Sequence, residues 1–124
     1  RAGITRLGAI HRGFHAFENS GYRNVPRWQL VHALKSLYPQ LPIICDISHI
    51  AGHTDYLKMI AQQACDLNLE GLMVETHCDP VNALSDAGQQ ITPEALFRLP
   101  PDHPDPSRPT PGEYAHLLLP APNP

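Results

Sequence analysis

Three short apolar runs in the sequence end at ionisable residues whose types could do chemistry together. The runs cover residues 8–10, 42–45 and 71–74, and the ionisable residues at or just after their ends are His11, Arg12, Asp46, His49, Glu75 and His77. Imidazole nitrogens and carboxylate oxygens are donors of intermediate hardness, which suit manganese, iron, cobalt or zinc. A divalent metal held by such a set would act as a Lewis acid on a carbonyl group. Because such groups follow three successive runs, one shared site is favoured over three coincidences.

Arg12 stands directly before Gly13 and adds a second kind of chemistry. Its guanidinium presents a planar fork of donors, and a glycine lets the backbone approach a bound group closely. This arrangement suits a phosphate or a carboxylate and predicts an anionic substrate. Structural interpretations of single residues stay open, since Asp46 could cap a turn and Arg12 could form a surface ion pair.

The three apolar runs are typical of buried strands, and helical patterns lie between them. Continuous apolar runs suit strands covered on both faces, which predicts strands near 8–11, 42–46 and 71–75. Pro26 can open one helix, and Thr54 can cap another. Their apolar positions recur at helical spacing: Trp28, Val31, Leu34 and Leu37 in the first helix, and Leu57, Ile60, Ala61, Ala64 and Leu67 in the second.

A third helix is predicted from residues 92–94, where Thr92 supplies a capping hydroxyl, Pro93 suits the first helical position and Glu94 puts an acid in the first turn. The predicted order is therefore β-α-β-α-β-α. Strands that alternate with helices form a parallel sheet, because each helix carries the chain back over the sheet before the next strand begins. We expect an α/β fold with three adjacent parallel strands in sequence order, helices on one face, and the ionisable residues at the carboxyl edge.

The composition limits the size and the class of the protein. The chain has 124 residues and a net charge of −3, without a basic stripe, so we expect no nucleic-acid partner. It contains no apolar stretch of membrane-spanning length and no long apolar core near its start, which predicts a soluble, cytoplasmic protein. The three cysteines, Cys45, Cys65 and Cys78, have no CxxC spacing, so reduced thiols are expected rather than a disulfide framework or a cysteine-only zinc site.

The chain divides near Leu99 into two parts of different composition. Residues 1–99 show the alternating patterns of a folded unit, whereas residues 100–124 contain nine prolines. Proline fixes φ and removes a backbone donor, so this density resists both helix and sheet. We predict an extended or disordered tail, in which residues 114–119 could dock on another surface.

Four separated stretches resemble one enzyme family. They are HRGF at 11–14, LPIICDISHIAGH at 41–53, GLMVETHCDPVNALSD at 71–86 and the following QQITPE. Together they look like the last three strand-and-loop units of 3-deoxy-7-phosphoheptulonate synthase, most nearly of its short type I-beta group, which includes bacterial forms fused to chorismate mutase. The resemblance covers roughly residues 3–98. It implies the C-terminal portion of a TIM (β/α)8 barrel, of which this chain would carry about three β/α units, since a closed barrel needs about 200 residues or more.

The resemblance also implies an activity and a set of site residues. Such enzymes condense phosphoenolpyruvate with erythrose 4-phosphate, the entry step of the shikimate pathway to aromatic amino acids. His49 of DISH, Glu75 of VETH and Asp86 of ALSD match three of the four family metal ligands, and Arg12 matches the arginine that holds the phosphate of phosphoenolpyruvate. The cofactor would be a divalent metal, and the full-length enzyme is expected to be an oligomer.

The sequence also departs from the family pattern. The fourth metal ligand, a cysteine on an early strand, and a Lys-Pro-Arg substrate motif lie upstream in the family, and neither is present here. The cysteines of this chain stand at positions that do not match that ligand. Many relatives have a cysteine and an acid where this chain has Ile10 and His11, and the proline-rich tail does not continue the family's last helix. The 124 residues alone are therefore expected to be incomplete and inactive.

Three alternative functions remain open at this point. The first is 3-deoxy-manno-octulosonate 8-phosphate synthase, which shares the barrel, phosphoenolpyruvate and a similar order of metal ligands. The second is a non-catalytic fragment or partner chain that binds anions or metal. The third is a small open α/β binding protein, which would need a glycine-rich phosphate loop after the first strand, where this chain has HRGF.

Overall fold

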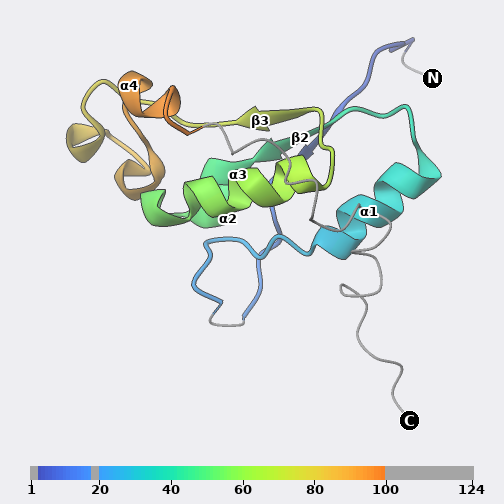
Figure 1. The fold of residues 1–124 in the computed structure, drawn as a ribbon, viewed down its shortest axis with the longest axis horizontal. Helices are drawn as coiled ribbons and strands as arrows, with labels where there is room; N and C mark the ends of the chain where they lie inside the picture. The colour runs from blue at the N-terminus through green and yellow to red at the C-terminus, as the bar shows by residue number, and fades with distance from the viewer. Residues whose placement is uncertain (1–2, 18–19, 100–124) are drawn as a thin grey trace.

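A parallel sheet of three strands forms the centre of the structure, a computed structural model that describes residues 3–17 and 20–99 (Figure 1). The strands are β1 (Ala9–His11), β2 (Ile43–Asp46) and β3 (Gly71–Met73), which pair in the order β1-β2-β3. Both pairings are parallel, with Ile10 opposite Ile44 and Cys45 opposite Leu72. The predicted α/β architecture with three adjacent parallel strands is confirmed, whereas the predicted tail at 100–124 lies outside the described residues.

Four α-helices and three short 3-10 helices complete the described part of the chain. The α-helices are α1 (Trp28–Leu37), α2 (Ile47–Ala51), α3 (Leu57–Asp66) and α4 (Pro93–Leu96), and the 3-10 helices are η1 (Thr54–Tyr56), η2 (Pro80–Asn82) and η3 (Ala87–Gln89). In Figure 1 the strand arrow of β3 points toward the end of the molecule where η2, η3 and α4 gather. The segment after β3 therefore surrounds the carboxyl edge of the sheet.

The two faces of the sheet have different surroundings. On one face, Ile43 and Cys45 are fully buried and join α1 and α3 in a single hydrophobic core. On the other face, Ile10 is 54% exposed and Ile44 is 37% exposed. Because side chains alternate between faces along a strand, this pattern shows helices over one face only, as predicted. In a (β/α)-barrel the face away from the helices is the barrel interior.

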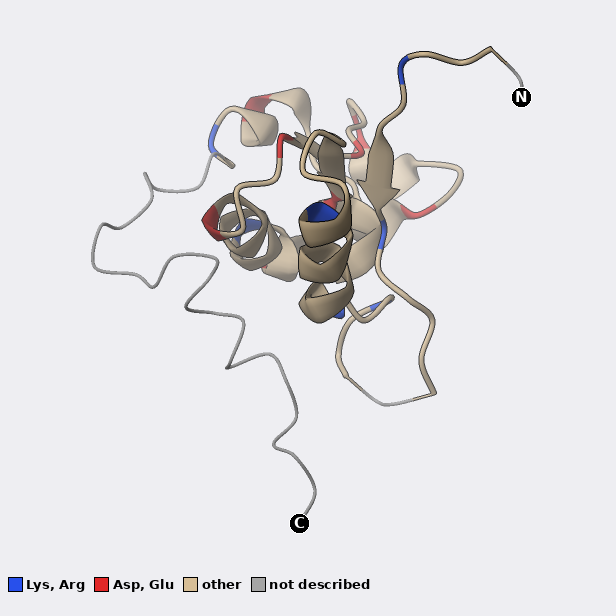
Figure 2. Cartoon of the chain, turned by 90° about the vertical axis from the view of Figure 1, so that its right-hand side faces the viewer, with Lys and Arg blue, Asp and Glu red and all other residues tan. Residues whose placement is uncertain are grey.

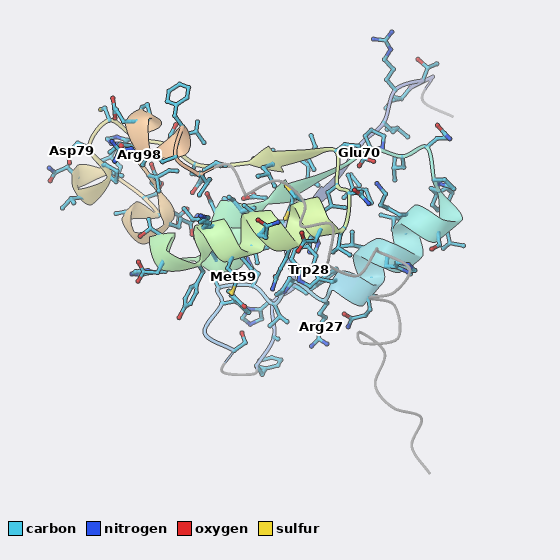
Figure 3. The ribbon with its side chains drawn as sticks, in the orientation of Figure 1. Arg27, Trp28, Met59, Glu70, Asp79 and Arg98 are labelled. Atoms are coloured by element: carbon cyan, nitrogen blue, oxygen red, sulfur yellow. The ribbon has the colours of Figure 1, made fainter. Side chains whose placement is uncertain are left out.

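Trp28 joins the two long helices at the centre of the core. Its ring is 9% exposed, and its indole Nε1 donates a hydrogen bond of 3.1 Å to Oε1 of Gln63 on α3. Figure 3 shows Trp28 at the start of α1, beside α3. Ile60 and Ala64 of α3 are fully buried in the same core, as their predicted helical spacing requires.

Two of the three predicted helix starts need correction. Pro26 does not occupy the first turn of α1, because Arg27 adopts a left-handed conformation (φ 41°) and the helix begins only at Trp28. Thr54 is the first residue of η1, and the cap is His53, whose Nδ1 accepts from the backbone N–H of Asp55. The third start is confirmed, since the Thr92 hydroxyl oxygen accepts from the backbone N–H of Ala95 at the start of α4.

A further tie links α1 to the start of β2. Glu70, labelled in Figure 3, accepts hydrogen bonds from the backbone N–H of Ile43 and from Nζ of Lys35. These bonds, the one from Ile43 first, lower the pKa of the Glu70 carboxyl group. Glu70, in the loop before β3, thereby ties the carboxyl end of α1 to the amino end of β2.

Charged residues are spread over several elements of the structure. In the view of Figure 2, blue and red positions occur on helices, loops and the approach to the sheet.

Among the described residues, no helix is long and apolar enough to cross a membrane.

Candidate metal centre

The strand register places the ionisable residues on two different sides of the carboxyl edge. His11 pairs with Cys45 and shares the helix-covered face with it, whereas Arg12 follows on the opposite side. Asp46 pairs with Met73 on that same open side, and Glu75 lies two residues beyond Met73. Alternation therefore brings Arg12, Asp46 and Glu75 to the side that would face a barrel interior.

His49 reaches this side from α2, a helix that the sequence analysis did not predict. Asp46 caps that helix, because its Oδ1 accepts from the backbone N–H of His49 at 3.1 Å. Its Oδ2 lies 2.8 Å from Nδ1 of the His49 ring. An ionised carboxylate only accepts, so we assign the ring hydrogen to Nδ1, which leaves the Nε2 lone pair available. The capping role foreseen for Asp46 is found, together with a second contact that orients the imidazole.

Glu75 and Asp86 bring carboxylate oxygens to the free nitrogen of His49. Oε1 of Glu75 lies 3.7 Å from Nε2 and Oδ2 of Asp86 lies 4.0 Å from it, and the three donor atoms are all within 4.8 Å of one another. The His49 side chain is 12% exposed, while about a third of each carboxylate side chain is exposed. The three side chains expected to converge therefore do so, and their role as metal ligands stays a prediction.

The loop after β3 carries Asp86 back to the edge of the sheet. Thr76 and Ile91 form a parallel bridge, and the backbone N–H groups of His77 and Ile91 bond to the carbonyls of Ile91 and Glu75. The chain between them includes η2 and η3 and closes on itself over the edge. Asp86 adopts a left-handed conformation (φ 52°) at the start of η3, which short polar side chains tolerate better than most.

The donor set fits a divalent cation. One imidazole nitrogen and two carboxylate oxygens match the preferences of manganese, iron, cobalt and zinc, and ligands about 2.0–2.2 Å from a cation lie roughly 3–4 Å from each other. The separations of 3.7 and 4.0 Å between His49 Nε2 and the two carboxylate oxygens need only small side-chain movements to meet that range. His49 also has the carboxylate partner on its second nitrogen that metal-binding histidines commonly have.

Arg12 lies beside this cluster, near Asp46. The sequence analysis expected Gly13 to let the backbone approach a bound group, but the structure gives a different reason for this glycine. Nε of Arg12 is 3.6 Å from Oδ2 of Asp46, and the arginine side chain is 58% exposed. Gly13 has φ +73°, and a Cβ there would lie 2.8 Å from Cβ of Asn24. Glycine is thus required for the turn and for packing on Asn24. The role of Arg12 in binding an anion is not tested by these contacts.

His11 is not part of the cluster. Its ring packs 5.0 Å from the Trp28 ring and is bonded to the carbonyl of Pro26, and its buried Nε2 has no hydrogen-bond partner among the described residues. Burial lowers the pKa of His11 to about 4. His11 therefore packs in the hydrophobic core and does not join the shared site that the strand ends suggested.

His77 and the cysteines also lie outside the three-residue cluster. Nδ1 of His77 accepts from the backbone N–H of Asp79, and Cys78 is exposed next to it. Cys45 is buried in the core, where desolvation raises its pKa to about 12. In the part of the chain that the structure describes, no cysteine joins His49, Glu75 and Asp86.

Sequence reasoning missed two residues that contact the cluster. Gln89 is 2% exposed and donates from Nε2 to Oε2 of Glu75 at 2.6 Å. Arg23 donates from Nη1 to Oδ1 of Asp86 at 2.6 Å and to Oε1 of Gln89 at 2.7 Å. Gln89 stood within the QQITPE stretch that carries the resemblance, whereas no pattern in the sequence singles out Arg23.

Known proteins match the part of the chain that contains the four stretches of the family resemblance. Residues 2–101 match the DAHP synthetase I family. The chain is 31% identical over 98 residues to the phospho-2-dehydro-3-deoxyheptonate aldolase of Thermotoga maritima, which covers 79% of this chain and 28% of that protein. It is 33% identical over 69 residues to the 2-dehydro-3-deoxyphosphooctonate aldolase of Helicobacter pylori, which covers 47% of this chain and 25% of that protein.

Solved structures show the same relationship. A truncated form of 3-deoxy-D-arabino-heptulosonate 7-phosphate synthase from Thermotoga maritima is similar with a TM-score of 0.69 and 30% identity, over 78% of this chain and 36% of that one. The phospho-2-dehydro-3-deoxyheptonate aldolase of the same organism has a TM-score of 0.61 and 29% identity, over 73% of this chain and 26% of that one. The predicted partial (β/α)-barrel is thereby confirmed. The chain spans less than a third of the two curated relatives, and it belongs to the DAHP synthetase I family.

Proposed function

We propose that the protein containing this chain condenses phosphoenolpyruvate with erythrose 4-phosphate to give 3-deoxy-7-phosphoheptulonate, and that this chain supplies three of its metal ligands. Family membership supports the reaction class. The observation that carries the proposal is the convergence of His49 Nε2, Glu75 Oε1 and Asp86 Oδ2 at one edge of the sheet. Carboxyl edges of parallel strands are where barrel enzymes place their chemistry.

The chain's own residues have separate tasks in this proposal. A bound divalent metal would supply Lewis acidity toward the aldehyde carbonyl of the sugar phosphate. Asp46 keeps the His49 ring oriented through Nδ1, so that Nε2 faces the carboxylates. In the overall reaction the enol carbon of phosphoenolpyruvate bonds to the aldehyde carbon, water adds at the neighbouring carbon, and inorganic phosphate leaves.

Arg12 binds the phosphate of phosphoenolpyruvate in this proposal. Its side chain is exposed on the side of the sheet that carries Asp46, and its planar fork suits a phosphate. The contact of 3.6 Å between Arg12 Nε and Asp46 Oδ2 connects the anion site to the residue that holds His49. One buried carboxylate thus orients both the proposed metal ligand and the proposed substrate-binding group.

A second candidate is the synthesis of 3-deoxy-manno-octulosonate 8-phosphate. The similarity to the Helicobacter pylori 2-dehydro-3-deoxyphosphooctonate aldolase favours it. An eight-carbon product requires a five-carbon aldehyde where the seven-carbon product requires a four-carbon one. The heptulonate reaction is preferred because the Thermotoga heptonate relative covers 79% of the chain, against 47% for this octonate relative.

The test is an assay of phosphate release by the protein that contains this chain. Phosphoenolpyruvate should be consumed with erythrose 4-phosphate and not with a five-carbon aldose phosphate, and a chelator should stop the reaction. His49→Ala should abolish turnover, whereas His53→Ala should leave it unchanged, since that side chain is 58% exposed and lies outside the three-residue cluster. Turnover only with the five-carbon sugar would establish the second candidate, and full activity of His49→Ala would refute both.

A further inference from the structure

Each of the three proposed metal ligands has one polar atom held by a protein partner and a second atom turned toward the other two ligands. His49 offers Nε2 while Nδ1 contacts Asp46. Glu75 offers Oε1 while Oε2 accepts from Gln89, and Asp86 offers Oδ2 while Oδ1 accepts from Arg23. All three residues therefore have one polar atom held by a protein partner and one polar atom left open. Asp46, Gln89 and Arg23 therefore each hold one of the proposed ligands.

Gln89 is the most constrained of these residues. Its side chain is among the largest that are fully buried, and both ends of its amide are bonded. Arg23 only donates and an ionised Glu75 only accepts, so the amide has a single orientation that satisfies both neighbours. A buried amide with both ends engaged rigidifies its surroundings, because any rotation leaves polar groups unsatisfied.

Arg23 lies far from Asp86 and Gln89 in the sequence but contacts both of them. A single nitrogen, Nη1, donates both to Asp86 and to Gln89, and so links the two carboxylates of the cluster through one guanidinium. Its positive charge lies against a group of acidic side chains, which reduces their mutual repulsion. Asp86 has a left-handed backbone (φ 52°), and the bond from Arg23 restrains its side chain in that setting.

The backbone around Arg23 is docked on the helix that carries His49. The N–H groups of Arg23 and Asn24 bond to the carbonyls of Ala51 and Ile50, at 3.4 and 3.3 Å, and the Asn24 amide donates to the carbonyl of His49 at 2.8 Å. Gly52 permits this approach, since a Cβ there would lie 2.5 Å from Cβ of Arg23. The position of Arg23 is thus set by α2, independently of the carboxylates that it binds.

We propose that Arg23 and Gln89 are positioning residues for the metal centre, which hold the carboxylates of Asp86 and Glu75 in the orientation that binds a divalent cation. This inference rests on the proposed function, because it concerns the same three ligands. Neither residue is one of the three proposed metal ligands. Both act by restricting the carboxylates, so their loss lowers metal affinity and changes the coordination of the metal that does bind.

The test is a titration with Co²⁺ of the protein that contains this chain, followed by the visible absorption of the bound ion. Gln89→Met should weaken binding by roughly 10- to 100-fold, the range typical of outer-shell partners, and should alter the spectrum at saturation. Gln90→Met is the matched control, because the amide of that neighbouring glutamine donates to the carbonyl of Ser85 and lies outside the cluster. It should leave both the affinity and the spectrum unchanged.

Arg23→Lys separates geometry from charge. Lysine keeps the positive charge but loses the planar guanidinium, so weaker binding in this variant reports positioning. Because both residues act through one chain of contacts, the loss in the Gln89→Met/Arg23→Lys double variant should be smaller than the product of the single losses. Arg23 is on the surface, so this arm remains informative even where the buried Gln89 variant fails to fold.

The outcomes distinguish the inference from the proposed function. If the unmodified protein binds Co²⁺ and Arg23→Lys and Gln89→Met bind it with unchanged affinity and spectrum, the positioning role is wrong while the metal site stands. Losses that multiply in the double variant would mean that the two residues act separately, and this would also overturn the shared role. If the unmodified protein binds no Co²⁺, Mn²⁺ or Zn²⁺, the metal site itself is wrong and the inference falls with it.

Discussion

His11 and His49 lie near the ends of neighbouring strands and are both nearly buried, but their surroundings are opposite. His11 faces the helix-covered core, with its ring against Trp28 and Nε2 unpaired. His49 faces the open side, with Nδ1 on Asp46 and Nε2 toward two carboxylates. Burial alone therefore does not identify a functional histidine. What separates the two is whether both ring nitrogens have chemically matched neighbours.

The helix-covered face should dominate stability, and adjacent isoleucines of β2 test this. Ile43 is 1% exposed and Ile44 is 37% exposed on the opposite face. Ile43→Ala should lower the free energy of unfolding by about 2–5 kcal/mol, the usual loss for a buried isoleucine, and Ile44→Ala by less than that. Chemical denaturation of the 124-residue chain measures both. Equal losses would mean that the second face is covered as well, and the contrast between faces would be lost.

His11 should make stability depend on pH in the acid range. Its folded pKa of about 4 lies below the ordinary value of 6.5, so the unfolded chain takes up a proton at a higher pH than the folded chain. The stabilisation is complete above pH 6.5 and is lost as the pH falls toward 4, by up to about 3 kcal/mol. Denaturation midpoints measured between these values should show this slope.

A pair of substitutions assigns that slope to His11. His11→Phe should flatten it, since phenylalanine does not titrate, although its stability should be lower above pH 6.5 because the Pro26 carbonyl loses its partner. His53→Phe makes the same change at a histidine that is 58% exposed and lies outside the core, and it serves as the matched comparison. An unchanged slope in His11→Phe would place the acid sensitivity elsewhere.

A substitution on the open side of the sheet should change substrate binding rather than the stability of the fold. Arg12→Lys should weaken phosphoenolpyruvate binding by about 1–3 kcal/mol, because lysine lacks the fork that grips a phosphate. Unfolding should be nearly unaffected, since the arginine side chain is 58% exposed. Steady-state kinetics on the protein that contains this chain would check this. An unchanged Michaelis constant and turnover would remove Arg12 from the site.

Thiol reactivity should also differ between the exposed edge of the sheet and the buried core, with the smallest expected effect. Cys78 is exposed beside the edge, whereas Cys45 is buried in the core with a pKa raised to about 12. Since the thiolate is the reactive form, iodoacetamide at pH 8 should label Cys78 first and Cys45 only after unfolding. Mass spectrometry of the peptides gives the order. Labelling of Cys45 at the rate of Cys78 in the folded chain would contradict the burial described.

Sequence patterns predicted the strands well because a buried parallel strand needs a continuous apolar run, and each run ends within one residue of the end of its strand. They failed for α2, since five residues, Ile47–Ala51, are too few to show a helical period. The patterns also misplaced the start of α1, because no feature of the sequence predicts the left-handed conformation of Arg27. Local structure was predictable to the extent that local residues determine it.

The candidate site was predictable only in part, for a related reason. The strand ends and the resemblance pointed to His49, Glu75 and Asp86, and the topology brings them together. Neither could predict Arg23, whose partner Gln89 is 66 positions away in the chain. Spacing indicates which residues share an edge, whereas the atom that each one presents depends on contacts formed only in the folded chain.

Metal binding by His49 and Glu75 is the most direct test of this account. The protein that contains this chain, freed of metal by a chelator, should take up Mn²⁺ or Zn²⁺ in a saturable titration followed by calorimetry. The heat of binding should be lost in His49→Ala and in Glu75→Ala and retained in His53→Ala. Binding of unchanged affinity in both His49→Ala and Glu75→Ala would contradict the account, because the two side chains that meet at 3.7 Å would then hold no metal.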